Sequence, residues 1–236
     1  KEHQLHELWN DDDISNLYDT KKAPSWEDRA ALKIMKSSMH KEDGHYVVQQ
    51  PWKEMPPFFP NNRSVVFKRF QTLEKKFEND PQYLADYAHT MSESIRKGHA
   101  EVVPKSELRT SPGQCNYIAH HGVRHPRKNS IRVVFDTSLK TDGKNLSSFI
   151  YHGPDFLNLL TGIIFRFRLR RIAVIGDLEC FYHSVYIPRS DRNYYRFFWY
   201  KNNDPTSIVI EYRVCVHLMG GNSSQSCCLL ALNDSI

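Results

Sequence analysis

Asp177 is the residue whose position in the sequence says most about chemistry. It follows the apolar run Ile172-Ala173-Val174-Ile175, and Tyr182 comes five positions after it. Such a run predicts a strand buried on both faces, and a carboxylate at the end of that strand is costly to desolvate unless it is hydrogen-bonded or binds a cation. One use of this geometry is to hold Mg²⁺ for phosphoryl transfer. The alternative, which the spacing alone favours, is an aspartate that ends a strand and caps a turn.

The elements that must position these residues follow from hydrophobic periodicity, caps and turn residues. Helices are predicted at residues 26–39, 62–78, 81–97 and 155–168, and strands at 46–49, 131–135, 172–175, 195–200 and 208–216. Ser25 is a suitable N-cap for the first helix. The run Asn202-Asn203-Asp204-Pro205 is a good turn, so the last two strands are predicted to form an antiparallel hairpin.

The charge of the 236-residue chain is unevenly divided. Residues 1–104 carry 15 basic and 17 acidic side chains, whereas residues 105–236 carry 17 basic and 10 acidic ones. Twelve of those 17 basic residues are arginines. A basic half rich in arginine and aromatic residues is expected of a surface that holds phosphate backbones, and composition alone fits a solvated cationic face equally well.

The sequence also indicates in which cellular compartment the protein is expected. No stretch reaches the roughly 20 apolar residues that a membrane helix needs, and the polar, acidic residues 1–20 do not form a signal peptide. The five cysteines include no C-x-x-C pair, which argues against a disulfide framework or a zinc site and suits a reducing compartment. We therefore expect an intracellular, cytoplasmic protein with no membrane partner.

Four blocks of sequence occur in a distinctive order. They are residues 118–126 with 131–138 (IAHHGVRHP and IRVVFDTS), 153–158 with 165–168 (GPDFLN and FRFR), 176–185 (GDLECFYHSV), and 212–220 with 223–227 (YRVCVHLMG and SSQSC). From about Cys115 onward the chain thereby resembles the reverse transcriptase of BEL/Pao-type LTR retrotransposons. Residues 1–104 resemble the stretch between protease and polymerase in the same polyproteins.

The resemblance implies an α+β fold. Residues 105–236 would be the reverse transcriptase fingers and the front half of the palm, an antiparallel sheet backed by helices. Residues 1–104 would be a partly helical linker region between protease and polymerase. In the family, further catalytic carboxylates lie on a later hairpin with an aromatic-x-Asp-Asp motif, and no such motif follows Asp177 in this sequence. We therefore expect a fragment truncated before that hairpin.

The resemblance also implies roles for single residues. Asp177 matches the first catalytic aspartate and, with the backbone carbonyl of Leu178, would bind Mg²⁺ in a two-metal site. Tyr182 matches the aromatic steric gate that excludes a ribose 2′-OH, and Arg132 matches the fingers arginine that grips the incoming triphosphate. Gly220 and Gly221 match the turn that lets the backbone approach a nucleotide.

Each of these assignments has a simpler alternative. Tyr182 could be a core aromatic at a strand end, Arg132 a solvated strand residue, and the two glycines part of any strand–turn–helix junction. Three further residues, His120, His121 and His125, could be mistaken for a metal cluster. No cysteine or acid stands at zinc-ligand spacing beside them, so we interpret them as solvated or hydrogen-bonded histidines.

The predicted function is therefore that of a fragment of an RNA-directed DNA polymerase. Its partners would be an RNA template, a DNA primer, deoxynucleoside triphosphates and the remainder of the polyprotein. Asp177 alone cannot hold two metal ions, so we expect the fragment to be inactive by itself. The alternative is a non-catalytic nucleic-acid-binding remnant of a decayed or domesticated element, whose binding would be salt-sensitive and independent of sequence.

Overall fold

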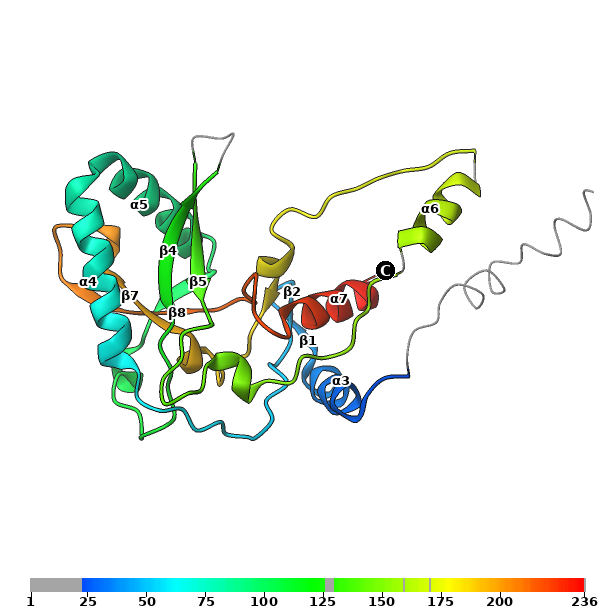
Figure 1. Cartoon of the computed structure of the whole chain (residues 1–236), viewed down its shortest axis with the longest axis horizontal. Helices are drawn as coiled ribbons and strands as arrows, with labels where there is room; N and C mark the ends of the chain where they lie inside the picture. The colour runs from blue at the N-terminus through cyan, green and yellow to red at the C-terminus, as the bar shows by residue number, and fades with distance from the viewer. Residues whose placement is uncertain (1–22, 126–129, 159, 170, 236) are drawn as a thin grey trace, which may run out of the picture.

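The computed structural model describes residues 23–125, 130–158, 160–169 and 171–235. Within these residues the fold is α+β, as predicted, and its small sheets are mainly antiparallel. The helices are α3 (Trp26–Ser38), α4 (Arg63–Asn79), α5 (Pro81–Arg96), α6 (Leu160–Leu169) and α7 (Ser224–Ser235). Figure 1 shows α4 and α5 beside the β4–β5 hairpin, with α3 and α7 at the other end of the body.

The first three helices confirm the sequence prediction, because their caps and apolar stripes are local features. Ser25 and Asp28 form a reciprocal capping box at the start of α3. Asp80 accepts a hydrogen bond from the backbone N–H of Tyr83 at the start of α5, where Pro81 occupies the first helical position. Gly98 follows α5 with φ of +73°, which a glycine adopts without steric cost.

Three small sheets make up the β structure. The first has the order β3-β8-β7 and is antiparallel throughout, the second is the β4–β5 hairpin, and the third has the order β1-β2-β6 with a parallel β2–β6 pair. The strands are β1 (His40–Glu42), β2 (His45–Val47), β3 (Ala100–Val102), β4 (Ala119–Arg124), β5 (Ile131–Asp136), β6 (Val185–Tyr186), β7 (Arg196–Tyr200) and β8 (Val209–Val214). The predicted hairpin between residues 195–200 and 208–216 is confirmed by the β7–β8 pairing.

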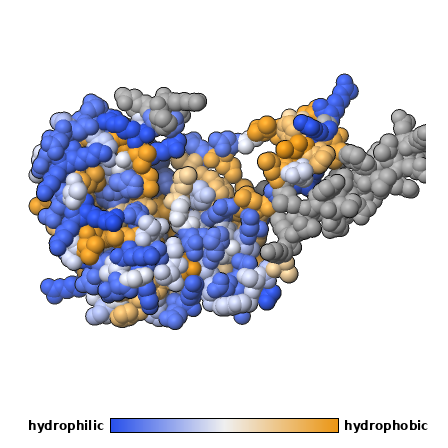
Figure 2. All heavy atoms as spheres, viewed as in Figure 1, coloured by the Kyte–Doolittle hydropathy of each residue, from blue (hydrophilic) through white to orange (hydrophobic). Residues whose placement is uncertain are grey.

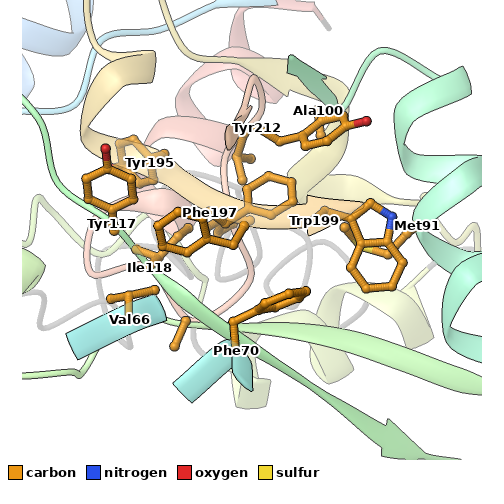
Figure 3. Close-up of a cluster of buried hydrophobic side chains, with 14 of the residues drawn as sticks. Val66, Phe70, Met91, Ala100, Tyr117, Ile118, Tyr195, Phe197, Trp199 and Tyr212 are labelled. Atoms are coloured by element: carbon orange, nitrogen blue, oxygen red, sulfur yellow. The ribbon is translucent and has the colours of Figure 1, made fainter. Parts of the chain in front are cut away.

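The main core lies between α4, α5 and the strands β4, β7 and β8. Figure 3 shows this cluster, in which Phe70 from α4 and Met91 from α5 lie near Phe197 and Trp199 of β7. All four side chains are almost completely buried. Because α4 and α5 precede residue 104 and β4, β7 and β8 follow it, residues from both predicted segments contribute to one hydrophobic core.

A second, smaller core joins α3 and α7. Ala31 and Met35 of α3 pack with Cys227, Cys228 and other buried residues around the start of β6. Phe181 and Tyr182, in the short 3₁₀ helix η3 (Phe181–Ser184), pack against this cluster. The second core therefore fixes the segment that follows Asp177.

A network of charged side chains, two of them buried, joins β7 and β8 to the start of α4. The Arg196 side chain is fully buried and contacts Glu211 at 3.2 Å, and Arg63 contacts the same carboxylate at 2.8 Å. The Tyr117 hydroxyl donates a third hydrogen bond to Glu211, at 2.8 Å. Buried charges are stable only when they are paired in this way.

The strand predicted at residues 172–175 is absent, which corrects the sequence analysis. Residues 172–178 are extended but belong to no sheet, and Ile172, Val174 and Ile175 are exposed. A strand buried on both faces needs a layer on each side, and the described residues provide none for this segment. The predicted helix at 155–168 is also shorter, since α6 begins at Leu160. Figure 2 shows a hydrophobic patch over α6.

Candidate functional site

A cavity of about 700 Å³ lies between the β4–β5 hairpin and the region around η3. Its walls come from α5, β3, β5, β8, η3 and the turn after β8. Most of its lining is apolar, with a few polar groups, a combination typical of small-molecule sites. The lining residues are Thr90, Met91, Glu93, Ser94, Lys97, His99, Ala100, Ile131, Arg132, Val133, Val134, Phe135, Cys180, Tyr182, His183, Val214, Val216, Leu218, Met219 and Gly220.

Arg132 lies in the cavity wall on β5, opposite Val123 of β4. The strand that carries it is attached at both ends. At one end the Thr90 hydroxyl of α5 donates a hydrogen bond to the Ile131 carbonyl at 3.2 Å. At the other end Arg69 of α4 pairs with Asp136 at 2.8 Å. Against the effect of burial, hydrogen bonds from Ser138 and this ion pair lower the pKa of the Asp136 carboxyl. The position of Arg132 is therefore set by two helices.

A further attachment holds β4. The Tyr83 hydroxyl donates to the Gly122 carbonyl at 3.1 Å and accepts from the Gly122 N–H at 3.0 Å. A Cβ at position 122 would lie 2.6 Å from that hydroxyl, which is closer than side chains tolerate. Glycine is thus required at this position for α5 and the hairpin to approach each other.

Tyr182 lines the opposite side of the cavity, in η3. The turn before η3 is sharp, because Cys180 has φ of +53° and its carbonyl accepts hydrogen bonds from the backbone N–H groups of His183 and Ser184. Tyr182 is half-buried and packs against the second core as well as facing the cavity. Tyr182 is therefore both an aromatic residue packed in the second core and part of the cavity wall.

Of the two glycines, the structure brings only Gly220 to the cavity. Gly220 has φ of +85°, a conformation that favours glycine, and it leaves open space around the position of a Cβ. Gly221 instead serves the turn itself: its N–H donates to the Leu218 carbonyl at 3.0 Å, and a Cβ there would lie 2.4 Å from the Ser224 hydroxyl.

Asp177 and Leu178 do not line the cavity. Both are exposed on the extended segment before η3, and Leu178 leaves 54 % of its surface accessible. The structure therefore brings together Arg132, Tyr182 and Gly220, while it leaves Asp177, Leu178 and Gly221 outside the cavity lining.

The charged residues of the cavity lining are Arg132, Lys97 and Glu93, the last of which pairs with Arg96 at 2.7 Å, and two uncharged histidines lie beside them. The His99 and His183 rings lie with centroids 4.9 Å apart. Burial, assisted by His183 and Lys97, lowers the pKa of His99 to about 4, and burial with Lys97 also lowers the pKa of His183. Both imidazoles are thus uncharged near neutral pH, and Arg132 and Lys97 supply the positive charge of the walls.

The sequence analysis missed the wall that α5 and β3 contribute, including Thr90, Lys97 and His99. These residues lie in the part predicted to be a linker. The apolar stripe of α5 was visible in the sequence, yet nothing in it indicated which other element α5 would face. Their position depends on long-range packing.

The three histidines predicted to be solvated or hydrogen-bonded do not form a metal cluster. His120 is buried, and its Nε2 donates to the Phe198 carbonyl at 2.8 Å, while its Nδ1 accepts from the Tyr87 hydroxyl. His121 is exposed. Nowhere in the part of the chain that the structure describes do three His, Cys, Asp or Glu side chains group so as to hold a metal ion. Mg²⁺ therefore stays a prediction, and it would need carboxylates in addition to Asp177.

Comparison with known proteins adds no family assignment. No protein-family model matches this chain, and a search of curated proteins gives no match. A separate structural finding concerns membranes: among the described residues, no helix has both the length and the apolar character required to cross a bilayer.

Proposed function

We propose that this chain is the fingers and the front part of the palm of an RNA-directed DNA polymerase of the BEL/Pao type. The cavity carries this proposal. Arg132, Tyr182 and Gly220 come from three different blocks of the sequence resemblance, and they line one cavity of about 700 Å³. Residues that bind one nucleotide are expected to meet in one cavity, and this convergence supports the proposal.

The side chains fit the roles that the resemblance gives them. A guanidinium such as that of Arg132 pairs with phosphate oxygens through two parallel hydrogen bonds and neutralises their charge. The ring of Tyr182 would restrict the room beside the sugar, which favours deoxynucleotides. Gly220 leaves the backbone open to close approach. RNA template, DNA primer and deoxynucleoside triphosphate are accordingly the proposed partners, and the rest of the polyprotein would supply the missing parts.

The decisive test is extension of a DNA primer on an RNA template in the presence of Mg²⁺. This chain is compared with a version extended by a segment that carries the aromatic-x-Asp-Asp hairpin. We expect only the extended version to incorporate deoxynucleotides, and we expect Asp177→Asn to abolish that incorporation. Activity that persists in the Asp177→Asn variant would refute the assignment of Asp177.

A second test uses the chain itself and measures nucleotide binding by fluorescence. Arg132→Ala should weaken binding of a deoxynucleoside triphosphate about 10- to 100-fold, the effect of losing a charge-assisted hydrogen-bond pair. Arg171→Ala is the matched control, since Arg171 is exposed and lies outside the cavity lining. If the two variants bind alike while primed template still binds in a salt-sensitive manner, the non-catalytic nucleic-acid-binding alternative is favoured.

A further inference from the structure

The turn after β8, residues 218–222, forms one wall of the cavity. Leu218, Met219 and Gly220 line the cavity at this turn. Inside the turn the Gly221 N–H donates to the Leu218 carbonyl at 3.0 Å, and Gly220 has φ of +85° with no other atom near its Cβ position. Because glycine is the most flexible residue, a turn with two adjacent glycines needs support from outside to keep one shape.

The residues at the two ends of this turn are buried and polar. His217 precedes the turn and Ser223 follows it, and both are almost completely buried. The Nε2 of His217 donates to the Val48 carbonyl at 3.0 Å. Since burial keeps this imidazole uncharged by lowering its pKa to about 4, its single ring proton lies on Nε2, and Nδ1 is an acceptor. The turn therefore has an acceptor at one end and a hydroxyl donor at the other.

The side chain of Gln50 joins these two ends. Its Nε2 donates to the Nδ1 of His217 at 3.3 Å, and its Oε1 accepts from the Ser223 hydroxyl. A carboxamide carries both a donor and an acceptor, so it satisfies both partners at once. Gln50 is only 2 % exposed, and an unmade hydrogen bond in such a buried place is costly. We call the three side chains Gln50, His217 and Ser223 the clamp.

The backbone that carries Gln50 is itself fixed. The Val48 N–H donates to the Tyr186 carbonyl of β6 at 2.9 Å, next to the β2–β6 pairing. The Asp191 carboxylate accepts a hydrogen bond from the backbone N–H of Gln50. The 3₁₀ helix η3, which carries Tyr182, runs directly into β6. The clamp therefore connects the turn to the same part of the fold that holds Tyr182.

We propose that Gln50 is a positioning residue for the cavity: its amide holds both ends of the turn 218–222 and thereby fixes the wall formed by Leu218, Met219 and Gly220. Gln50 belongs to the part of the sequence that resembles a linker, and no motif gives it a role. It lies outside the cavity lining, so it leaves the space beside Arg132 to a nucleotide. Its effect on nucleotide binding rests on the proposed function, whereas the clamp itself does not.

Hydrogen exchange tests the clamp in the absence of any ligand. Gln50→Met replaces the amide by an unbranched apolar side chain, so the Ser223 hydroxyl and the Nδ1 of His217 lose their partner. We expect the Gly221 amide to exchange about ten times faster in this variant than in the unsubstituted chain, the scale of one lost hydrogen bond. Equal exchange in the two proteins would overturn the proposal.

The matched control for this experiment is Asn62→Leu. Asn62 is a second buried amide, and it hydrogen-bonds with Asn116 and Tyr117, neither of which lines the cavity. Asn62→Leu should lower the free energy of unfolding as well, yet leave the exchange of the Gly221 amide in the folded protein unchanged. A local increase in Gln50→Met alone therefore separates positioning from a general loss of stability.

Nucleotide binding tests the consequence for the site, with dTTP and Mg²⁺ as the probe. Gln50→Met should weaken binding about tenfold, and the double variant Gln50→Met with Ser223→Ala should bind no more weakly, because both substitutions act through one clamp. Additive effects of the two substitutions, or unchanged affinity in Gln50→Met, would overturn the positioning role. Ser223→Ala removes a single hydroxyl, so it carries both tests if Gln50→Met does not fold.

Failure of this proposal and failure of the proposed function give different results. An unsubstituted chain that binds no dTTP refutes the proposed function, and exchange of the Gly221 amide then decides whether Gln50 holds the turn. A chain that binds dTTP while its Gly221 amide exchanges alike with and without Gln50 keeps the proposed function and refutes the positioning role.

Discussion

The stability of this protein should fall steeply as the pH is lowered from 7.5 to 5, because two buried histidines must stay uncharged. His120 donates from Nε2 to the Phe198 carbonyl and accepts at Nδ1 from Tyr87, and His217 donates from Nε2 to the Val48 carbonyl at 3.0 Å. Burial lowers the pKa of each imidazole to about 4. The folded state therefore resists protonation that the unfolded chain accepts at its ordinary pKa of 6.5.

The size of the effect follows from this difference in pKa. Since the folded-state pKa is depressed, the stabilisation is complete above pH 6.5 and is lost as the pH falls toward 4. When the pH is lowered from 7.5 to 5, one such imidazole lowers the free energy of unfolding by about 2 kcal/mol, and the pair lowers it by about 4 kcal/mol. A small domain has about 5–15 kcal/mol in total, so this loss is large.

Urea unfolding followed by tryptophan fluorescence at pH 7.5 and pH 5 measures the effect. His120→Gln cannot become charged, so its unfolding free energy should change between the two pH values by about 2 kcal/mol less than that of the unsubstituted chain. The matched control is His121→Gln, at the neighbouring exposed position, which should keep most of the pH dependence because the buried imidazole of His120 remains. If His120→Gln keeps the full pH dependence, the reasoning from burial is wrong.

Three further substitutions test the packing that positions the cavity. Gly122→Ala should cost about 1–3 kcal/mol, because a Cβ would lie 2.6 Å from the Tyr83 hydroxyl; the urea midpoint reports it. Arg196→Ala should cost about 3–5 kcal/mol by removing a fully buried partner of Glu211, measured in the same way. Ser25→Ala removes the capping box of α3 and should cost about 1 kcal/mol, visible as a lower Tm.

Matched variants separate these mechanisms from a general sensitivity to substitution. Gly176→Ala introduces the same methyl group where no other atom lies within 4 Å, so a cost equal to that of Gly122→Ala would contradict the steric argument. Arg63→Ala removes a half-exposed partner of the same carboxylate and should cost less than Arg196→Ala. A larger loss of unfolding free energy in Arg63→Ala would show that burial of the arginine does not determine the cost of losing it.

Local features of the sequence predicted local structure well. The stripe Val66, Phe70, Leu73 and Phe77 recurs at helical spacing, and all four side chains are buried in α4. The N-cap at Ser25 and the turn between β7 and β8 were likewise recognisable, because each is defined within a few residues. Such elements are stabilised by their own neighbours in sequence.

Long-range packing was not predictable in the same way. The run at 172–175 has the composition of a buried strand, but a strand exists only with a partner, and no described residue pairs with it. The hydrogen bond between Tyr87 and His120 joins residues 33 positions apart. Periodicity placed Tyr87 on the apolar face of a helix, and His120 was expected to be solvated or hydrogen-bonded, but nothing in the sequence linked the two. The wall of the cavity from α5 was missed for the same reason.

The same distinction explains why the structure assembles only part of the predicted site. Arg132 is fixed by the register of β5 against β4 and by attachments to α4 and α5, all of which lie within the described residues. Tyr182 is fixed by the second core. Asp177 has neither kind of support, because residues 172–178 pair with no strand among the described residues and their large apolar side chains are exposed. The predicted site residues that are fixed by packing therefore line the cavity, whereas Asp177, which lacks such packing, lies outside its lining.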